Sequence, residues 1–485
     1  MGCLSSQYAT PTPRFAVNHF PSLIRVVVLA LGLVLVAWAQ PVRAQSPGDV
    51  ELSLDQARNL AVYALQSGDP GLAIQLSRGL LQANPKDPVA HYVIASAFAQ
   101  LNQPRASRIA AARAYRFSDP GPDRFRAAQL AAQMAYAERR YSLAQIWLRR
   151  TAIHVETEDE KKLVARDYQL LRRQNPWSFR VQTDLRPSSN VNNGSDTALQ
   201  IIDGVPVTGT LSGAARALSG LIGSVDLSTG YRLRANATSA TTIGARLFVQ
   251  RVALSGAAKD LAPDASGADY ASTFAEMSLR HGFAVGPPER RGSGAVDLAL
   301  GESWWGGERS YRFGRITAER AWALQPRTRL EIYALAERRF KSRYRVNDAR
   351  VFGMGAEIGR AMANGDRLNV TVALRDTDAK SANGSFTSAS LRTSYTFKRP
   401  VGPARLTAGL VLGYSDYPVF RSGLLLVPGG RQDRSVYGDV SLFFDRYDYA
   451  GFAPLLRLRT GRKKSNDSRF TTRDLSVSLG IASKF

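Results

Sequence analysis

The stretch TRDLSVSLGIASKF, residues 472–485, decides the fold of this chain. Apolar residues take every second position from Leu475 to Ile481, and polar or small residues mostly fill the positions between them. Successive side chains of a strand point to opposite faces of a sheet, so this alternation predicts a β-strand with one apolar face. The stretch ends on an aromatic residue, Phe485.

The same period of two recurs through the C-terminal two-thirds of the chain, as in residues 367–375 and 391–398. Counting the segments between turn signals gives about fourteen strands, an even number, as in bacterial single-chain barrels. A wall between lipid and water needs one apolar and one polar face, and averaging the two explains the mean hydropathy of −0.20. We therefore predict that residues 175–485 form an all-β antiparallel transmembrane β-barrel. An all-β domain outside a membrane is the alternative, but it does not require so many strands.

A strand that has one apolar face and stops at Phe485 resembles the closing strand of bacterial outer-membrane barrels, in which the last aromatic is part of the assembly signal. Phe485 is therefore the candidate barrel assembly signal, and the barrel assembly machinery is an expected partner. The bacterial outer membrane is the expected location, with its lipid and lipopolysaccharide as further partners.

The connections between the expected strands alternate in length. Long ones are expected at residues 188–219, 253–269, 341–349, 378–385, 418–433 and 463–471, and tight turns at 235–236, 325–326, 363–365 and 448–451. One expected outer loop, Trp305 to Glu308, is short. Long outer loops and short periplasmic turns are typical of outer-membrane barrels, so both ends of the strand domain are expected in the periplasm.

The formal net charge is +24, and on its own it suggests nucleic acid as a partner. The basic residues are dispersed through alternating segments, and the chain begins with an export signal, so we expect no nucleic acid. A basic barrel lumen or contacts with lipopolysaccharide explain the charge better. The expected lumen-facing basic residues are Arg367, Arg375, Arg392, Arg457 and Arg459.

Residues 1–44 read as a secretion signal. Arg14 and Arg25 precede an apolar run at residues 26–39, and small residues follow it. The run is shorter than a spanning helix needs, although an uncleaved anchor is the alternative. The only cysteine, Cys3, lies inside this segment, so the mature chain is expected to lack disulfides and thiolate metal sites.

Residues 45–174 are rich in Ala, Leu, Gln and Arg and carry helix-breaking signals at regular intervals. The helices between the breaks pair into three units near the 34-residue tetratricopeptide period, followed by a polar helix at residues 158–174. This predicts a tetratricopeptide-like helical repeat domain, with a plain helical bundle as the alternative. The expected repeat-packing positions are Gly68, Ala73, Pro85, Ala95, Phe98, Ala114 and Ala144.

No catalytic constellation stands out, so we expect no enzyme, no metal and no cofactor. Only His91, His154 and His281 follow the signal, without metal-ligand spacing. An outer-membrane phospholipase needs a Ser and a His on the barrel wall, and His281 is the lone candidate for the latter. The sequence therefore favours binding of a cargo and its passage through the barrel over catalysis. Tetratricopeptide stacks hold an extended chain, and a barrel offers a pore or a lateral seam.

Four stretches carry a resemblance to a known family. NPWSF at residues 175–179 and PSSNVNNGS at 187–195 resemble the opening strand and first loop of the surface lipoprotein assembly modifier family, called Slam. GFAPLL at 451–456 and SNDS at 465–468 are similar to its last hairpin. The resemblance covers essentially the whole mature chain.

The resemblance implies an outer-membrane translocator that delivers particular lipoproteins, or soluble proteins that capture haem or metals, to the cell surface. The helical domain, in the periplasm, would engage this protein cargo. The family-motif positions carried over are Trp177, Pro187, Asn190 and Asn192, expected to shape the first strand and loop.

Two other functions remain open at this stage. An exopolysaccharide secretion porin also joins tetratricopeptide helices to a barrel, but acidic or aromatic lumen rows are expected there. A passive channel for anions leaves the helical domain unexplained.

Overall fold

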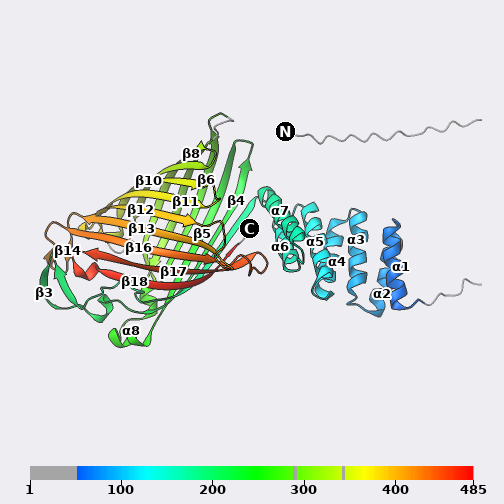
Figure 1. Ribbon diagram of the computed structural model, residues 1–485, viewed down its shortest axis with the longest axis horizontal. Helices are drawn as coiled ribbons and strands as arrows, with labels where there is room; N and C mark the ends of the chain where they lie inside the picture. Colours follow the sequence, from blue (N-terminus) through cyan, green and yellow to red (C-terminus); the bar gives the residue numbers. More distant parts are fainter. Residues whose placement is uncertain (1–51, 288–291, 341–344, 484–485) are drawn as a thin grey trace, which may run out of the picture. The chain divides into compact units, whose positions relative to one another are not determined.

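The computed structural model describes residues 52–287, 292–340 and 345–483 of the chain (Figure 1). The expected signal at residues 1–44, with Cys3, lies outside these ranges, as does Phe485. Both expectations therefore stay predictions.

In the described part, seven helices precede the barrel. Their bounds are α1 Leu54–Gln66, α2 Pro70–Ala83, α3 Pro88–Gln100, α4 Pro104–Phe117, α5 Pro122–Ala137, α6 Tyr141–Ile153 and α7 Glu158–Gln174. Each helix packs on the next, and α1 also contacts α3, as α3 contacts α5. Three helical pairs and a final helix agree with the predicted tetratricopeptide-like arrangement.

Local sequence fixes where these helices begin. Pro70 and Pro88 occupy the first turns of α2 and α3, where a missing N–H costs nothing. The Asp69 and Asp87 side chains accept hydrogen bonds from the backbone at the start of these helices, at 2.9 and 3.0 Å. Gly68 in the preceding turn has φ +81°, a conformation that glycine adopts without strain.

Small residues fill the core of the helical stack. Ala73, Ala95, Ala114 and Ala144 are each 0% exposed. Phe98 is partly buried and packs against the two clusters of buried residues in the stack. Two of the predicted packing positions, Gly68 and Pro85, are exposed, and both lie in turns between helices. The alanine side chain is a single methyl group, which is small enough to let neighbouring helices approach closely.

The remaining chain forms a closed antiparallel barrel of fourteen strands. Its strands are β1 Trp177–Ser188, β4 Gly220–Ala235, β5 Ser239–Leu254, β6 Ser272–Val285, β7 Gly292–Trp305, β8 Glu308–Gln325, β9 Thr328–Phe340, β10 Ala349–Ala361, β11 Arg367–Ala379, β12 Phe386–Thr396, β13 Arg405–Tyr417, β16 Arg431–Phe443, β17 Phe452–Ser465 and β18 Thr472–Ser483. Neighbours along the chain pair in order, and β1 closes the ring against β18. The predicted fold class is confirmed.

The barrel turns its apolar side chains outward. On β18, Leu475 and Leu479 are each 59% exposed, whereas Ser476 and Ser478 between them are 4% and 7% exposed. Pairing carries this parity around the sheet, since Leu479 lies opposite Leu456. Strand residues whose side chains point to the same face of the sheet as Leu479 are said to have outward parity. Those whose side chains point to the same face as Ser478 have inward parity.

The connections divide between two ends of the barrel, as the length pattern predicts. The loop end carries the connections β1–β4, β5–β6, β7–β8, β9–β10, β11–β12, β13–β16 and β17–β18, and the turn end carries the others. The β1–β4 loop contains the hairpin β2 Leu199–Ile202 and β3 Val205–Thr210, and β5–β6 contains α8 Gly256–Leu261. The β13–β16 loop contains β14 Arg421–Ser422 and β15 Leu425–Leu426. Because β1 begins at the turn end, the chain leaves α7 there.

None of the described helices is both long enough and apolar enough to cross a bilayer.

Candidate functional site

The helical stack contains a groove of about 300 Å³ between α5 and α7. Tyr136 of α5 and Leu170 of α7 line it and are 45% and 47% exposed. Leu148 and Leu171 form its buried floor. Exposed apolar side chains beside a concave surface suit an extended apolar segment of another chain. The sequence pattern does not identify this groove, because the groove depends on how α7 packs on α6.

Two arginines join the last helices to the barrel. The Arg149 guanidinium on α6 donates to the Ala450 carbonyl at 2.9 Å and lies 4.4 Å from the Phe452 ring centroid. Arg232 on β4 donates to the carbonyls of Arg173 and Gln174 at 2.9 and 3.0 Å. The last carbonyls of a helix lack partners within it, so Arg232 caps the end of α7.

Inside the barrel, a cavity of about 780 Å³ is lined by inward side chains from β6 to β12. Arg315 lies between Glu276 and Glu337, and Glu337 also accepts from Arg339 at 2.8 Å. Arg280 pairs with Glu319 on the same wall. The ion pairs cross several strands and form a ladder that holds these long side chains against the wall.

The five arginines predicted to face the lumen lie on the inward parity. Arg457 and Arg459 are opposite Ser478 and Ser476 on β18. Arg392 is opposite Thr371 on β11, the parity shared by Arg367 and Arg375. The pairings of β12 with β13, of β13 with β16 and of β16 with β17 put Arg392 on the same face of the sheet as Ser478.

Most of these arginines have a neighbour that holds them. Arg392 pairs with Asp439 at 3.3 Å, and Arg457 donates to the Ser441 hydroxyl at 3.1 Å. Arg459 lies 4.7 Å from the Tyr437 ring centroid. Acids that the sequence pattern did not single out, such as Asp439 and Glu337, lie on the same inward face, so the interior is mixed in charge and not simply basic.

The seam between β1 and β18 is the weakest junction of the ring in the described chain. β1 pairs with β4 at all 12 of its residues, from Trp177 to Ser188. It pairs with β18 at four positions, the first of which joins Thr183 to Ile481. Trp177 and Phe179, before the seam pairing starts, are 44% and 67% exposed. Each missing pair removes ladder hydrogen bonds, so this seam is the easiest to part.

At the loop end, the first loop is fastened to the last one. The Ser195 hydroxyl donates to the Ser468 carbonyl at 2.9 Å, and the Ile201 N–H donates to the Ser468 hydroxyl at 2.8 Å. Asp467, which is 0% exposed, accepts from Ser422 and from Gln200. Three loops far apart in the sequence therefore meet at one buried carboxylate.

The asparagines of the first loop hold its backbone. Asn190 donates to the Gly194 carbonyl and accepts from the Gly194 N–H, both at 2.8 Å. Asn192 donates to the Arg216 carbonyl at 2.7 Å and accepts from the Leu218 N–H at 3.0 Å. Pro187 lies on β1 with outward parity. These contacts fit a structural role in shaping the loop.

A buried arginine supports the loops from below. The Arg431 guanidinium lies 3.7 Å from the Tyr417 ring centroid and 3.9 Å from that of Phe470, and it pairs with Asp433 at 3.2 Å. Aromatic faces attract a cation strongly when water is excluded. Nothing in the sequence pattern distinguishes Arg431 from the other strand arginines.

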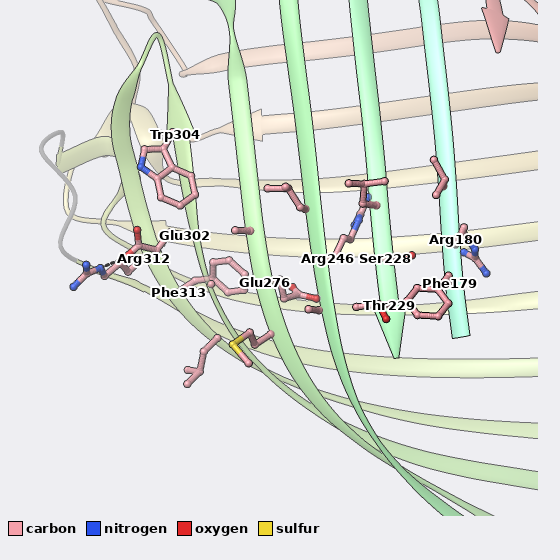
Figure 2. A pocket seen from close by; sticks show the side chains of 18 of the residues that line it. Phe179, Arg180, Ser228, Thr229, Arg246, Glu276, Glu302, Trp304, Arg312 and Phe313 are labelled. Carbon is pink, nitrogen blue, oxygen red and sulfur yellow. Dashed lines mark hydrogen bonds and ion pairs between the residues drawn. The ribbon is translucent and has the colours of Figure 1, made fainter. Parts of the chain in front are cut away.

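The wall from β1 to β9 also carries an apolar hollow of about 980 Å³ (Figure 2). Most of its lining side chains have outward parity, among them Phe179 and Trp304, which lie at opposite ends of the row in Figure 2. Glu302 and Arg312 form an ion pair beside Trp304. An aromatic next to a paired charge near a strand end is typical of a membrane interface.

The three histidines are structural in their surroundings. His91 stacks on Phe117 and bonds the Pro85 carbonyl at 3.0 Å, and burial lowers its pKa. Burial also lowers the pKa of His154, which lies beside Tyr115. His281 has outward parity and bonds the Thr241 hydroxyl. Across the described ranges there is no group of three side chains that could hold a metal ion.

No protein-family model and no curated protein sequence matches the chain. Among solved structures, the outer membrane protein opdK from Pseudomonas aeruginosa is similar at 11% identity and TM-score 0.30, over 63% of this chain and 98% of that chain. OccD3 (OpdP) of the same organism is similar at 8% identity and TM-score 0.31, over 64% and 92%. The first TPR domain of human RPAP3 is similar at 15% identity and TM-score 0.22, over 25% and 91%.

In its described residues the chain combines tetratricopeptide-like helices with a closed antiparallel barrel of fourteen strands.

Proposed function

We propose that this protein is an outer-membrane translocator that delivers particular lipoproteins, or secreted haem- or metal-capturing proteins, to the cell surface. The observation that carries the proposal is the β1–β18 seam, which is paired at four positions within the described residues, where β1–β4 is paired at 12. A lipoprotein has a polar chain and acyl tails, so its passage needs a route that is open to both the lumen and the hydrocarbon. A seam that parts easily provides one.

The groove between α5 and α7 gives the cargo a first binding site. Its exposed Tyr136 and Leu170 can pack against apolar side chains of an unfolded segment. Because α7 leads directly into β1, a segment held in this groove is released beside the strand that forms the seam. Periplasmic placement of the helices is part of this proposal.

The resemblance to the Slam family supports the same function. The bond from Ser195 to Ser468 fastens together two of the stretches that carry the resemblance, and the Asn190 and Asn192 contacts shape the first of them. These residues are proposed as structural, without a direct contact to cargo.

The groove can be tested by co-expressing the chain with lipoproteins encoded beside its gene and measuring their exposure on intact cells with antibody and protease. We expect Leu170→Glu to reduce display, because a charge in the groove must be desolvated when cargo binds. The matched control is Leu163→Glu on the same helix, at an exposed position outside the groove lining. Equal display by both variants contradicts the groove, and display after deletion of residues 177–485 contradicts the translocator itself.

The seam can be tested with disulfides, because the only native cysteine is Cys3. Leu185 and Leu479 are directly opposite across the seam, a spacing that a disulfide can bridge. We expect the L185C/L479C pair to block cargo display until a reductant is added. The control staple V181C/L227C joins β1 to β4 on its fully paired side and should leave display unchanged. Normal display with the oxidised seam staple rules out lateral passage.

Orientation can be tested separately with Leu424→Cys. Leu424 lies between β14 and β15 at the loop end and is 101% exposed. We expect a membrane-impermeant maleimide to label it on intact cells. Labelling only after the outer membrane is permeabilised would place the loops in the periplasm.

A specific observation also favours export of an exopolysaccharide. The cavity of about 780 Å³ is lined by Tyr311, Phe313 and Tyr333 together with Glu319 and Glu337. Aromatic faces and carboxylates are the groups expected to contact a sugar polymer. Tyr333→Ala should impair sugar export and spare lipoprotein display, so the two functions are separable by one variant.

A further inference from the structure

A basic cluster lies on the outward face of the barrel, at the loop end of β16, β17 and β18. It consists of Arg434, Arg462, Lys464 and Arg473, and all four are exposed. Arg434 is directly opposite Lys464, and Arg462 is directly opposite Arg473. All four share the outward parity of Leu475, so none of them lines the lumen.

This arrangement is costly unless an anion binds to it. Like charges directly opposite each other on neighbouring strands destabilise a sheet, and the cluster contains two such pairs. In the described chain Arg434, Arg462 and Lys464 make no ion pair. Arg473 pairs with Asp196 at 3.8 Å, and its backbone N–H donates to the same carboxylate at 2.6 Å. Asp416, two residues beyond Tyr414, is the nearest outward acid along β13.

Other outward bases at the loop end lie beside an acid or a carbonyl oxygen. Arg312 pairs with Glu302, and Arg338 pairs with Asp348 at 3.1 Å. Arg350, directly opposite Arg338, is also directly opposite Asp378, and Arg251 donates to the Ser272 carbonyl at 3.2 Å. The basic cluster differs in that its two opposed pairs of bases lie on three adjacent strands and only Arg473 is near an acid among the described residues.

The surroundings identify the kind of anion. Toward the middle of the strands the cluster is followed by Val436 and Leu475, and by Leu458 beyond Thr460 on β17; these three apolar side chains are 53%, 59% and 41% exposed. Tyr414, directly opposite Arg434, adds an aromatic at the same level. A ligand that fits has phosphates level with the cluster and acyl chains along the apolar strip below.

We propose that the basic cluster binds the phosphorylated headgroup of a glycolipid of the outer leaflet, the lipid A part of lipopolysaccharide. The proposal rests on the outer-membrane placement with the loops at the cell surface, and it does not depend on cargo. The Cβ atoms of directly opposed residues on paired strands are about 5 Å apart, so the guanidinium and ammonium groups that they carry can donate to one phosphate. Binding there fastens lipid to β17 and β18, next to the seam strand β1.

The test uses the full chain, purified in detergent, and native mass spectrometry with three lipids added separately. These are bisphosphorylated lipid A, monophosphorylated lipid A and phosphatidylglycerol. We expect the bisphosphorylated form to bind most tightly. R462Q/K464Q should lose about tenfold or more in its apparent affinity, because two charged donors are removed.

The matched control is R457Q/R459Q, on the same strand but with inward parity. It should leave lipid A affinity within about twofold, since these side chains face the lumen. Heat-modifiable migration in gels checks that each variant keeps its barrel. Unchanged affinity in folded R462Q/K464Q, an equal loss in the control, or equal affinity for phosphatidylglycerol each overturns the proposal. The Leu424→Cys labelling result separates a failure of orientation from a failure of this site.

Discussion

The helical stack and the barrel bury opposite kinds of side chain. In the stack the interior is made largely of alanine, as at Ala95 and Ala144, each 0% exposed. In the barrel the large apolar side chains face outward, as at Leu300, 68% exposed, while the interior carries ion pairs such as Arg315 with Glu337. The two regions are stabilised by different solvents: water drives the helices together, and hydrocarbon accommodates the outer wall of the barrel.

Exposure of an apolar side chain has opposite meanings in the two regions. Tyr136 and Leu170 are exposed on the stack and mark a groove where another chain can bind. Leu475 and Leu479 are equally exposed on the barrel, and there they mark contact with lipid. One residue type therefore predicts a partner in one region and a membrane in the other.

The largest expected effect comes from charging the outer wall. Leu391→Arg places a charge on the outward face of β12 and should destabilise the barrel by about 2–4 kcal/mol if the site is near the bilayer midplane. Ser390→Arg, one residue away on the inward face that lines the lumen cavity, should cost much less. Urea unfolding in lipid vesicles measures both. Equal losses of stability in the two variants would contradict the assignment of the β12 faces to lipid and to the lumen.

A smaller effect is expected from overfilling the helical core. Ala95→Leu inserts a larger side chain where α3 meets α4, at a residue whose carbonyl accepts from the Ser107 hydroxyl at 2.6 Å. We expect a loss of about 1–3 kcal/mol in the helices alone. Ala137→Leu, exposed at the end of α5, is the control. Hydrogen exchange should show faster exchange in α3 and α4 of the first variant, with the barrel unchanged.

The smallest effect is a pH dependence confined to the helices. Burial holds the pKa of His91 below its ordinary value, so the unfolded chain binds a proton more readily than the folded one as the pH falls. The stability of the stack should therefore decline as the pH drops through about 6.5, the pKa of an unfolded His. His91→Gln should flatten this decline, and His281→Gln, on β6 of the barrel, should not. Hydrogen exchange between pH 7 and pH 5.5 is the measurement; an unaltered slope in His91→Gln contradicts it.

Much of the fold is predictable because both regions have strict local periods. Proline and glycine breaks separate the helices, so their number and pairing follow from the sequence; Pro70 and Pro88 begin two of them. The alternation of apolar residues predicts strands, and it also assigns Arg457 and Arg459 to the polar face. Their inward parity in the structure follows from that alternation.

The site is less predictable because its parts come from distant segments. Asp467 is bonded to Gln200 and Ser422, and no local pattern announces that these three loops meet. The groove depends on how α6 places α7 beside α5, and the basic cluster depends on the register of three strands. A shift of one residue between β16 and β17 would turn Lys464 from the outward face to the lumen.

The two-part organisation, the helical pairs and the alternation that makes a wall follow from the sequence, because these features depend on periods within single segments. Three features follow from the folded chain: where the ring is weakest among the described residues, which loops meet at Asp467, and which four basic side chains lie together on the outer wall. These features depend on strand register and ring closure, which join residues hundreds of positions apart, and no local pattern encodes them.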